Sequence, residues 1–194
     1  GIAKDILGLP RNKRYILFGA MGGTNDKRKG YHFLKSALTQ LSEMNDLEDL
    51  AILVFGSSEP KDKPNLGFPI HYLGRIHDDV SLSVMYSAAE VTVTPSIQEA
   101  FGMTASESMA CGTPVVAFGS SGPLDVIDHR INGYLAKPYI IDDFANGIAW
   151  TLDRSRFKEL AFESRKKCEE KFDLSLVSKQ YTDLYEKVLN GKRS

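Results

Sequence analysis

The chain is poor in cysteine and histidine. Its 194 residues include two cysteines, Cys111 and Cys168, and four histidines, without a CxxC spacing or a histidine cluster. This scarcity excludes a disulfide framework and offers no ligand set for a metal, so we expect neither a metal nor a cofactor. Isolated cysteines are typical of a reducing cytosol, which is the expected location.

The sequence also lacks a large net charge and a long apolar run. The formal net charge is -1, which provides no basic footprint for nucleic acid or an anionic membrane. No apolar run approaches the roughly 20 residues that span a bilayer. The sequence has 42% apolar and 25% charged residues and contains no internal repeat. Residues 1–194 are therefore expected to form a single globular domain.

Short apolar runs recur along the chain. They lack polar alternation, which is typical of strands buried on both faces of a parallel sheet. We expect about six strands, of which the last is the weakest, at residues 14–20, 50–57, 69–74, 90–96, 113–119 and 133–137.

Helical patterns separate these runs. Residues 31–44 and 79–89 carry apolar residues at three- and four-residue spacings. Strands that alternate with helices predict a doubly wound α/β sheet. After Asp142 only helices are expected, and the last one carries an apolar stripe that must cover either this sheet or a domain outside the chain. The stripe consists of Val177, Tyr181, Leu184, Tyr185 and Val188.

The first expected strand runs into a glycine-rich basic loop, "GAMGGTNDKRKG". Glycines such as Gly22 and Gly23 let the backbone approach a ligand closely, and ligands bind at the carboxyl ends of parallel strands. Arg28 and Lys29 stand near the next helix start, where the helix dipole disfavours cations and attracts anions. The pair indicates a phosphate or diphosphate site, and a solvated basic loop is the equally weighted alternative. The loop matches the dinucleotide pattern G-x-G-x-x-G poorly, which disfavours NAD.

Two carboxylates, Glu99 and Glu107, flank the strand-to-helix turn "QEAFGMTASE". If the helix begins near Thr104, Thr104 and Glu107 have the spacing of a capping box, which is the simpler explanation of Glu107. The alternative is a carboxylate that accepts hydrogen bonds from a ribose diol. Glu99 lies in the loop without capping spacing, so it is either a solvated loop acid or a site residue.

The same stretch resembles the Glu-x7-Glu motif of the GT-B retaining glycosyltransferases of the group 1, or family 4, type. Ser108 replaces the common alanine, a change in size that we expect to be harmless. Asp125 and Arg130 also depart from the usual residues of a later segment, "GPLDVIDHRINGYLAKP". The resemblance covers nearly the whole chain. The motif residues shared with the family are Glu99, Phe101, Gly102, Glu107, Met109, Ala110, Gly112, Pro114, Val115 and Val116.

This resemblance implies a Rossmann-like domain that binds a nucleoside-diphosphate sugar. Glu107 would hold the ribose hydroxyls, and Glu99 would act catalytically beside the donor sugar. Arg28 and Lys29 would contact the diphosphate, although Ala20 stands where many members place the arginine. The other implied contacts are Arg75 and Ile76 beside the base, and the backbone N–H groups of Phe101, Gly102, Met103 and Thr104 at the sugar and phosphates.

Family members have two Rossmann-like domains, and this chain resembles the C-terminal one. We therefore expect the N-terminal acceptor domain to be absent and the isolated chain to transfer nothing. The full-length protein would transfer the sugar with retention, in polysaccharide biosynthesis, and any association with the inner membrane face would use the missing domain.

Two alternatives to a transferase remain. A UDP-sugar 2-epimerase of the GT-B type would share the fold and the nucleotide site, and it would epimerise a UDP-sugar. A non-catalytic α/β nucleotide-binding module would leave the activity of the full-length protein unchanged when Glu99 is replaced by glutamine.

Overall fold

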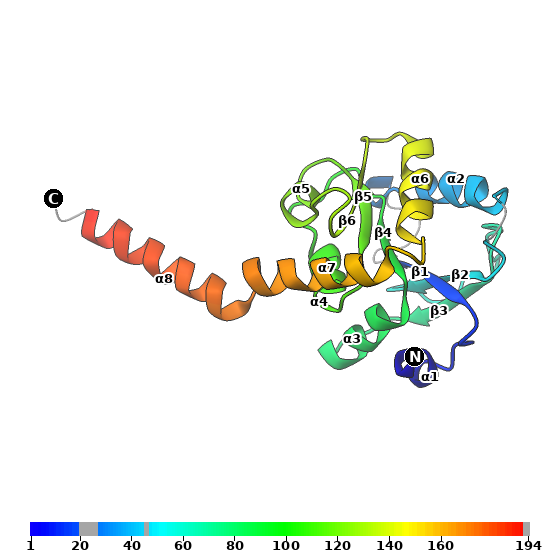
Figure 1. Ribbon diagram of the computed structural model, residues 1–194, viewed down its shortest axis with the longest axis horizontal. Coiled ribbons are helices and arrows are strands. Elements are labelled where there is room, and N and C mark those ends of the chain that lie inside the picture. The colour runs from blue at the N-terminus through cyan, green and yellow to red at the C-terminus, as the bar shows by residue number, and fades with distance from the viewer. Residues whose placement is uncertain (20–26, 45–46, 192–194) are drawn as a thin grey trace.

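The fold is a six-stranded parallel sheet with helices on both faces (Figure 1). The structure is a computed structural model that describes residues 1–19, 27–44 and 47–191. The strand order is β3-β2-β1-β4-β5-β6. The strands are β1 (Arg14–Gly19), β2 (Leu50–Phe55), β3 (Ile70–Gly74), β4 (Val91–Thr94), β5 (Val115–Phe118) and β6 (Gly133–Ala136). All six expected strands, including the weak sixth, are confirmed, and the sheet is Rossmann-like.

Alternate residues of each strand enter cores on opposite faces of the sheet. Ile16 and Phe18 of β1 pack on one face, and Tyr15 and Leu17 pack on the other. The first face is covered by α2 (Tyr31–Ser42) and α6 (Ile141–Thr151), which lie side by side in Figure 1. The second face is covered by α1 (Ile2–Ile6), α3 (Asp79–Ala88), α4 (Met103–Ala110) and α7 (Phe157–Lys171). Two short helices complete the chain before α8, namely the 3-10 helix η1 (Lys27–Lys29) and α5 (Pro123–Val126).

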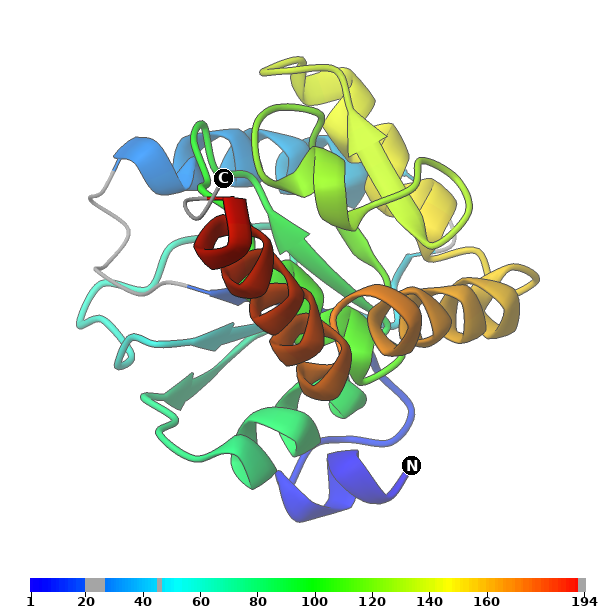
Figure 2. The ribbon, with the colours of Figure 1, turned by 90° about the vertical axis from the view of Figure 1, so that its left-hand side faces the viewer.

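Helix α8 (Leu174–Gly191) extends away from the body of the molecule in Figure 1 and points toward the viewer in Figure 2. None of its residues is buried, and Tyr181, Leu184, Tyr185 and Val188 of the apolar stripe are at least half exposed. The expectation that the stripe covers this sheet is therefore wrong. Its packing on another domain stays a prediction.

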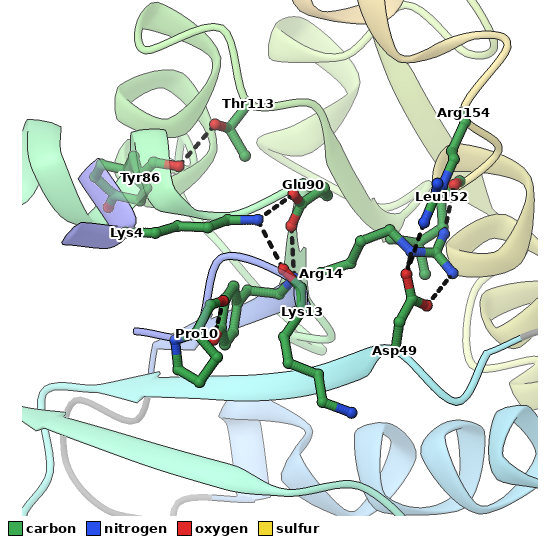
Figure 3. Close-up of polar contacts among 11 residues, drawn as sticks. Lys4, Pro10, Lys13, Arg14, Asp49, Tyr86, Glu90, Thr113, Leu152 and Arg154 are labelled. Carbon is green, nitrogen blue, oxygen red and sulfur yellow. Dashed lines mark hydrogen bonds and ion pairs between the residues drawn. The ribbon is translucent and has the colours of Figure 1, made fainter. Parts of the chain in front are cut away.

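Two carboxylates link the amino ends of the strands to each other and to α1 (Figure 3). Glu90, just before β4, accepts hydrogen bonds from Lys4 Nζ at 2.7 Å and from the Tyr15 backbone N–H at 2.5 Å. Asp49, just before β2, accepts two bonds from the Arg14 guanidinium, at 2.6 and 2.8 Å. These contacts lie at the amino ends of the strands, opposite the carboxyl ends described below.

A membrane-spanning helix is not found among the described residues, since none of their helices combines sufficient length with sufficient apolarity.

Candidate functional site

The switch in strand order lies between β1 and β4, where connections leave the sheet toward opposite sides. Ligands of doubly wound sheets bind at the carboxyl ends of strands at this point. The segments that follow β1 and β4 carry Lys29 and Glu99, respectively. The topology therefore brings the two sequence motifs to one edge of the sheet.

Lys29 and Glu99 are in direct contact. Lys29 Nζ lies 3.2 Å from Glu99 Oε2, although the residues are 70 positions apart in the sequence. Their side chains are 37% and 28% exposed, so solvent reaches both charges. The pair lines a small hollow together with Gly19, Thr94, Ser96, Gly102 and Thr104. A cation and a carboxylate thus face one cavity at the start of α4.

Helix α4 begins at Met103, and its N-cap is Gly102. Gly102 has a φ of +98°, a left-handed conformation that favours glycine because other residues would strain their Cβ there. No side chain caps this helix. The capping-box interpretation of Thr104 and Glu107 is therefore wrong, because Thr104 already lies inside the first turn. The Glu107 carboxylate instead accepts a hydrogen bond from the Tyr86 hydroxyl at 2.9 Å.

Backbone hydrogen bonds hold the loop that carries Glu99. The Ile97 N–H donates to the Arg28 carbonyl at 2.8 Å, and the Ile97 carbonyl accepts from the Tyr139 hydroxyl at 3.1 Å. The Glu99 N–H donates to Ser121 Oγ at 3.3 Å, and its carbonyl accepts from the Gly122 N–H at 3.0 Å. The loop is therefore positioned by neighbouring segments, and its carboxylate is preorganised.

Three neighbours of this loop have unusual backbone requirements. Ser121 and Tyr139 have positive φ angles of 50° and 64°, which are uncommon for residues other than glycine. Gly30 also has a positive φ, and a Cβ there would lie 1.8 Å from the Pro95 carbonyl oxygen. Such strain often gathers around functional sites, and here it surrounds the Glu99 loop.

A second hollow lies at the carboxyl ends of β2 and β3. Glu107 and Tyr86 line it, and Thr104 lines both hollows. The second hollow therefore adjoins the one that holds Lys29 and Glu99. Its other lining residues are Phe55, Gly56, Arg75, Ile76, His77, Leu82 and Met103. The tertiary structure thus collects Arg75, Ile76, Met103, Thr104 and Glu107, five of the residues singled out in the sequence.

Two of the expected residues that the structure describes, Phe101 and Arg28, lie outside these hollows. Phe101 packs its ring against Phe172 with a centroid distance of 5.4 Å and lies outside both linings. Arg28 is exposed and also lies outside them, while its carbonyl anchors the Glu99 loop. Gly22 and Gly23 lie outside the described residues. Lys29 is therefore the basic residue of the pair that the structure places at the site.

Sequence reasoning missed several residues of the site. Tyr86 belongs to the apolar spacing of residues 79–89, and this spacing gives no sign of a role at a site. Its ring joins the core, while its hydroxyl reaches Glu107. Thr94 was part of a strand, yet it lines the first hollow, and its buried hydroxyl has no partner within the described part of the chain. Ser121 and Tyr139 gave no signal, because their roles depend on backbone geometry and long-range contacts.

The hydroxyl of Ser108 takes part in buried hydrogen bonds. Its side chain is fully buried, and its hydroxyl donates to the Thr113 carbonyl at 2.9 Å and lies 2.7 Å from the Thr92 hydroxyl. Buried hydroxyls need such partners. The serine therefore adds a polar link between α4, β4 and the segment before β5.

Potential metal ligands do not cluster anywhere in the described ranges 1–19, 27–44 and 47–191. The charged groups that line the two hollows are Lys29, Arg75, Glu99 and Glu107, and the amino end of α4 adds a partial positive charge. A helix amino end offers unpaired N–H groups and a partial positive charge, and together with a lysine it suits an anion.

Comparisons with known proteins identify the family of the chain. A family model for glycosyl transferases group 1 matches residues 3–172. An uncharacterized glycosyltransferase of Methanocaldococcus jannaschii is 28% identical over 92% of this chain and 46% of its own length. A phosphatidyl-myo-inositol mannosyltransferase of Mycobacterium leprae is 29% identical over 96% of this chain and 50% of its own length. The chain thus spans about half the length of these curated relatives.

Solved structures give the same result for the fold. Sucrose-phosphate synthase from Thermosynechococcus elongatus has a TM-score of 0.77 and 29% identity, over 97% of this chain and 49% of that protein. Anabaena HepE in complex with UDP and glucose has a TM-score of 0.75 and 20% identity, over 95% of this chain and 51% of that protein. Because the family model matches most of the chain and the sheet carries the motif residues, the chain belongs to the glycosyl transferases of group 1.

Proposed function

We propose that this chain is the C-terminal, donor-binding domain of a two-domain glycosyltransferase. It binds a nucleoside-diphosphate sugar, and the full-length protein transfers the sugar to an acceptor with retention of configuration. The observation that carries the proposal is the contact between Lys29 and Glu99 at the start of α4, beside the hollow that holds Glu107. A cation, a carboxylate and a helix amino end then face one ligand.

The charges of the first hollow suit cleavage of a sugar from a diphosphate. Negative charge develops on the leaving diphosphate, and fixed cations and dipoles stabilise it. In our proposal, Lys29 supplies the cation and the amino end of α4 supplies the dipole, without a metal. Arg28 assists from the exposed side of the loop. Glu99 stabilises the positive charge that develops on the sugar, as carboxylates do in glycosidases. When the donor binds, its phosphates compete with Glu99 for Lys29.

The second hollow suits the nucleoside. Glu107 accepts hydrogen bonds from the ribose hydroxyls, and Arg75 and Ile76 flank the base. Support comes from the Anabaena relative of the same fold, which has been solved with UDP-glucose. Thr104 lines both hollows and Met103 lines the second, and in this proposal their backbone N–H groups, in the first turn of α4, contact the phosphates.

The acceptor site belongs to an N-terminal domain in this proposal, because the relatives are about twice as long. The isolated chain then binds donor without turnover. We further propose a cytoplasmic protein that acts in polysaccharide biosynthesis and reaches the inner membrane face through the other domain. Sustained sugar transfer by the isolated chain would contradict the two-domain division.

Calorimetric titration of the chain with UDP, GDP and ADP tests the donor site. We expect saturable binding of one nucleotide, weakened about tenfold or more by Lys29→Ala and by Glu107→Ala, since each removes a charge-assisted contact. Lys158→Ala is the matched control, because this exposed lysine lies on α7 away from both hollows. Absence of binding for all three nucleotides, or equal weakening by the control, would contradict the proposal.

A further inference from the structure

Tyr86 is a buried tyrosine whose hydroxyl faces a carboxylate. It lies near the end of α3, is 1% exposed, and packs its ring edge-on to Phe55 at 6.0 Å. The hydroxyl donates to Glu107 Oε2 at 2.9 Å. Burial and the neighbouring Glu107 charge raise the pKa of the Tyr86 phenol far above its ordinary value. The phenol therefore keeps its proton and remains a donor throughout the physiological range.

This hydrogen bond leaves acceptor positions on Glu107. An ionised carboxylate has two oxygens and about four lone-pair positions, of which the phenol occupies one. Glu107 is half-buried and lines the second hollow together with Tyr86 and Thr104. A half-buried carboxylate that is held at one oxygen has fewer orientations than a free one. Its remaining lone pairs therefore face the hollow in a defined direction.

A chain of buried hydrogen bonds holds Tyr86 itself in place. The Tyr86 carbonyl accepts from Thr113 Oγ1 at 2.8 Å, as Figure 3 shows. The Thr113 carbonyl accepts from Ser108, the residue that follows Glu107 in α4. These side chains are at most 2% exposed. The network therefore fixes α3 relative to α4, and with them the phenol relative to the carboxylate.

From this geometry we infer that Tyr86 is a positioning residue that orients Glu107 to accept both hydroxyls of a ribose. The residue thereby sets the preference of the site for ribonucleotides over 2′-deoxyribonucleotides. This inference rests on the proposed function, because it assigns a partner to the ribose-binding carboxylate. A purely structural role for the phenol, which would only satisfy a buried group, makes a different prediction for nucleotide selectivity.

Selectivity between ribose and deoxyribose separates these two roles. The chain is titrated with UDP, GDP and ADP, each beside its 2′-deoxy form, before and after Tyr86→Phe. We expect the ratio of the two affinities to fall by about tenfold in the variant, the size of a lost hydrogen bond to a charged group. Glu107→Gln should lower the ratio similarly, and adding Tyr86→Phe to it should change little, because the two residues act as one unit.

Tyr15→Phe is the matched control. Tyr15 is also fully buried, and its hydroxyl donates to the Pro10 carbonyl at 3.0 Å, at the opposite end of the sheet. This variant should keep the ribose preference of the unchanged chain, while thermal unfolding reports the stability of both variants. Ribonucleotide binding with an undiminished preference in Tyr86→Phe would overturn the inference and leave the proposed function standing.

The remaining outcomes also decide the inference. If the unchanged chain binds no nucleotide, the proposed function and the inference fail together. If Tyr86→Phe unfolds while Tyr15→Phe does not, the Tyr86 hydroxyl has a structural role and the positioning role is overturned.

Discussion

Thr92 and Thr94 lie two residues apart on β4, and their hydroxyls have different surroundings. The Thr92 hydroxyl lies 2.7 Å from the buried Ser108 hydroxyl. The Thr94 hydroxyl is buried at the first hollow without a partner in the described residues. An unpaired buried hydroxyl costs free energy that a paired one does not. At the scale of single residues, this contrast marks Thr94 as a residue placed for the site.

Replacement of each threonine by valine tests this contrast, because valine has nearly the same shape. We expect Thr94→Val to leave the free energy of unfolding unchanged or to raise it by up to about 1 kcal/mol. Thr92→Val should lower it by about 1–2 kcal/mol, because it leaves the Ser108 network incomplete. Chemical denaturation of both variants measures the difference. Equal losses in the two variants would mean that Thr94 has a partner.

At the scale of elements, contacts between remote segments place the site. The loop after β4 takes its position from η1, from the segment after β5 and from Tyr139 before α6. Each of these segments is a loop or a single short turn of helix, so no apolar periodicity marks its contacts. The buried strands beneath them supply the rigid frame, and the opposite end of the sheet carries the ion pairs of Glu90 and Asp49.

Asp49 gives a pH-dependent test of those ion pairs. Hydrogen bonds from Arg14, ahead of those from Arg154, hold the pKa of Asp49 below its ordinary value. A carboxylate with a lowered folded-state pKa adds stability above its unfolded pKa, and this stability is lost as the pH falls through the folded pKa. Asp49→Asn should therefore lower the free energy of unfolding by about 1–3 kcal/mol at pH 7. The difference from the unchanged chain should shrink below about pH 4.

Urea denaturation from pH 3 to pH 7 provides the measurement. Arg154→Ala serves as the control, because its side chain is 77% exposed and exposed ion pairs contribute little. A stability difference for Asp49→Asn that is constant across this range would show that the charge of Asp49 does not carry the effect.

At the scale of the whole molecule, α8 lies away from the body (Figure 1) and carries an exposed apolar stripe. Contiguous exposed apolar surfaces commonly mark interfaces. The relatives are about twice as long as this chain, which leaves room for a domain that covers the stripe. In the chain alone, the stripe contributes little to stability because folding does not bury it.

Serine substitutions on α8 should therefore lower the free energy of unfolding only in the longer protein. We expect Leu184→Ser together with Val188→Ser to change the free energy of unfolding of this chain by less than about 0.5 kcal/mol. In the full-length protein, the same pair should cost about 2 kcal/mol or more if the stripe is buried there. Thermal unfolding of both proteins, with Lys179→Ser as an exposed polar control, measures this. A large loss in the isolated chain would contradict the exposed position of the stripe.

The sequence by itself determined the layers of this protein. Runs such as "LAILVFGS" and helical spacings such as Leu34, Leu38 and Leu41 are local patterns, and burial on both sheet faces requires them. The strands and main helices were therefore predictable, and the resemblance of one continuous stretch indicated Glu99 and Glu107. The capping-box hypothesis placed the N-cap of α4 at Thr104, two residues after the observed N-cap Gly102, because a glycine with positive φ leaves no side-chain capping signal.

Only the tertiary structure decided which groups meet. Strand order brings Lys29 to Glu99 across 70 residues and brings Arg75, Tyr86 and Glu107 to one hollow. It also left α8 uncovered, a result that its amphipathic pattern does not distinguish from packing. Periodicity reports which face of an element is buried, because that property is local to the chain. The partner of a particular atom depends on how elements far apart in sequence are arranged, and folding alone establishes that arrangement.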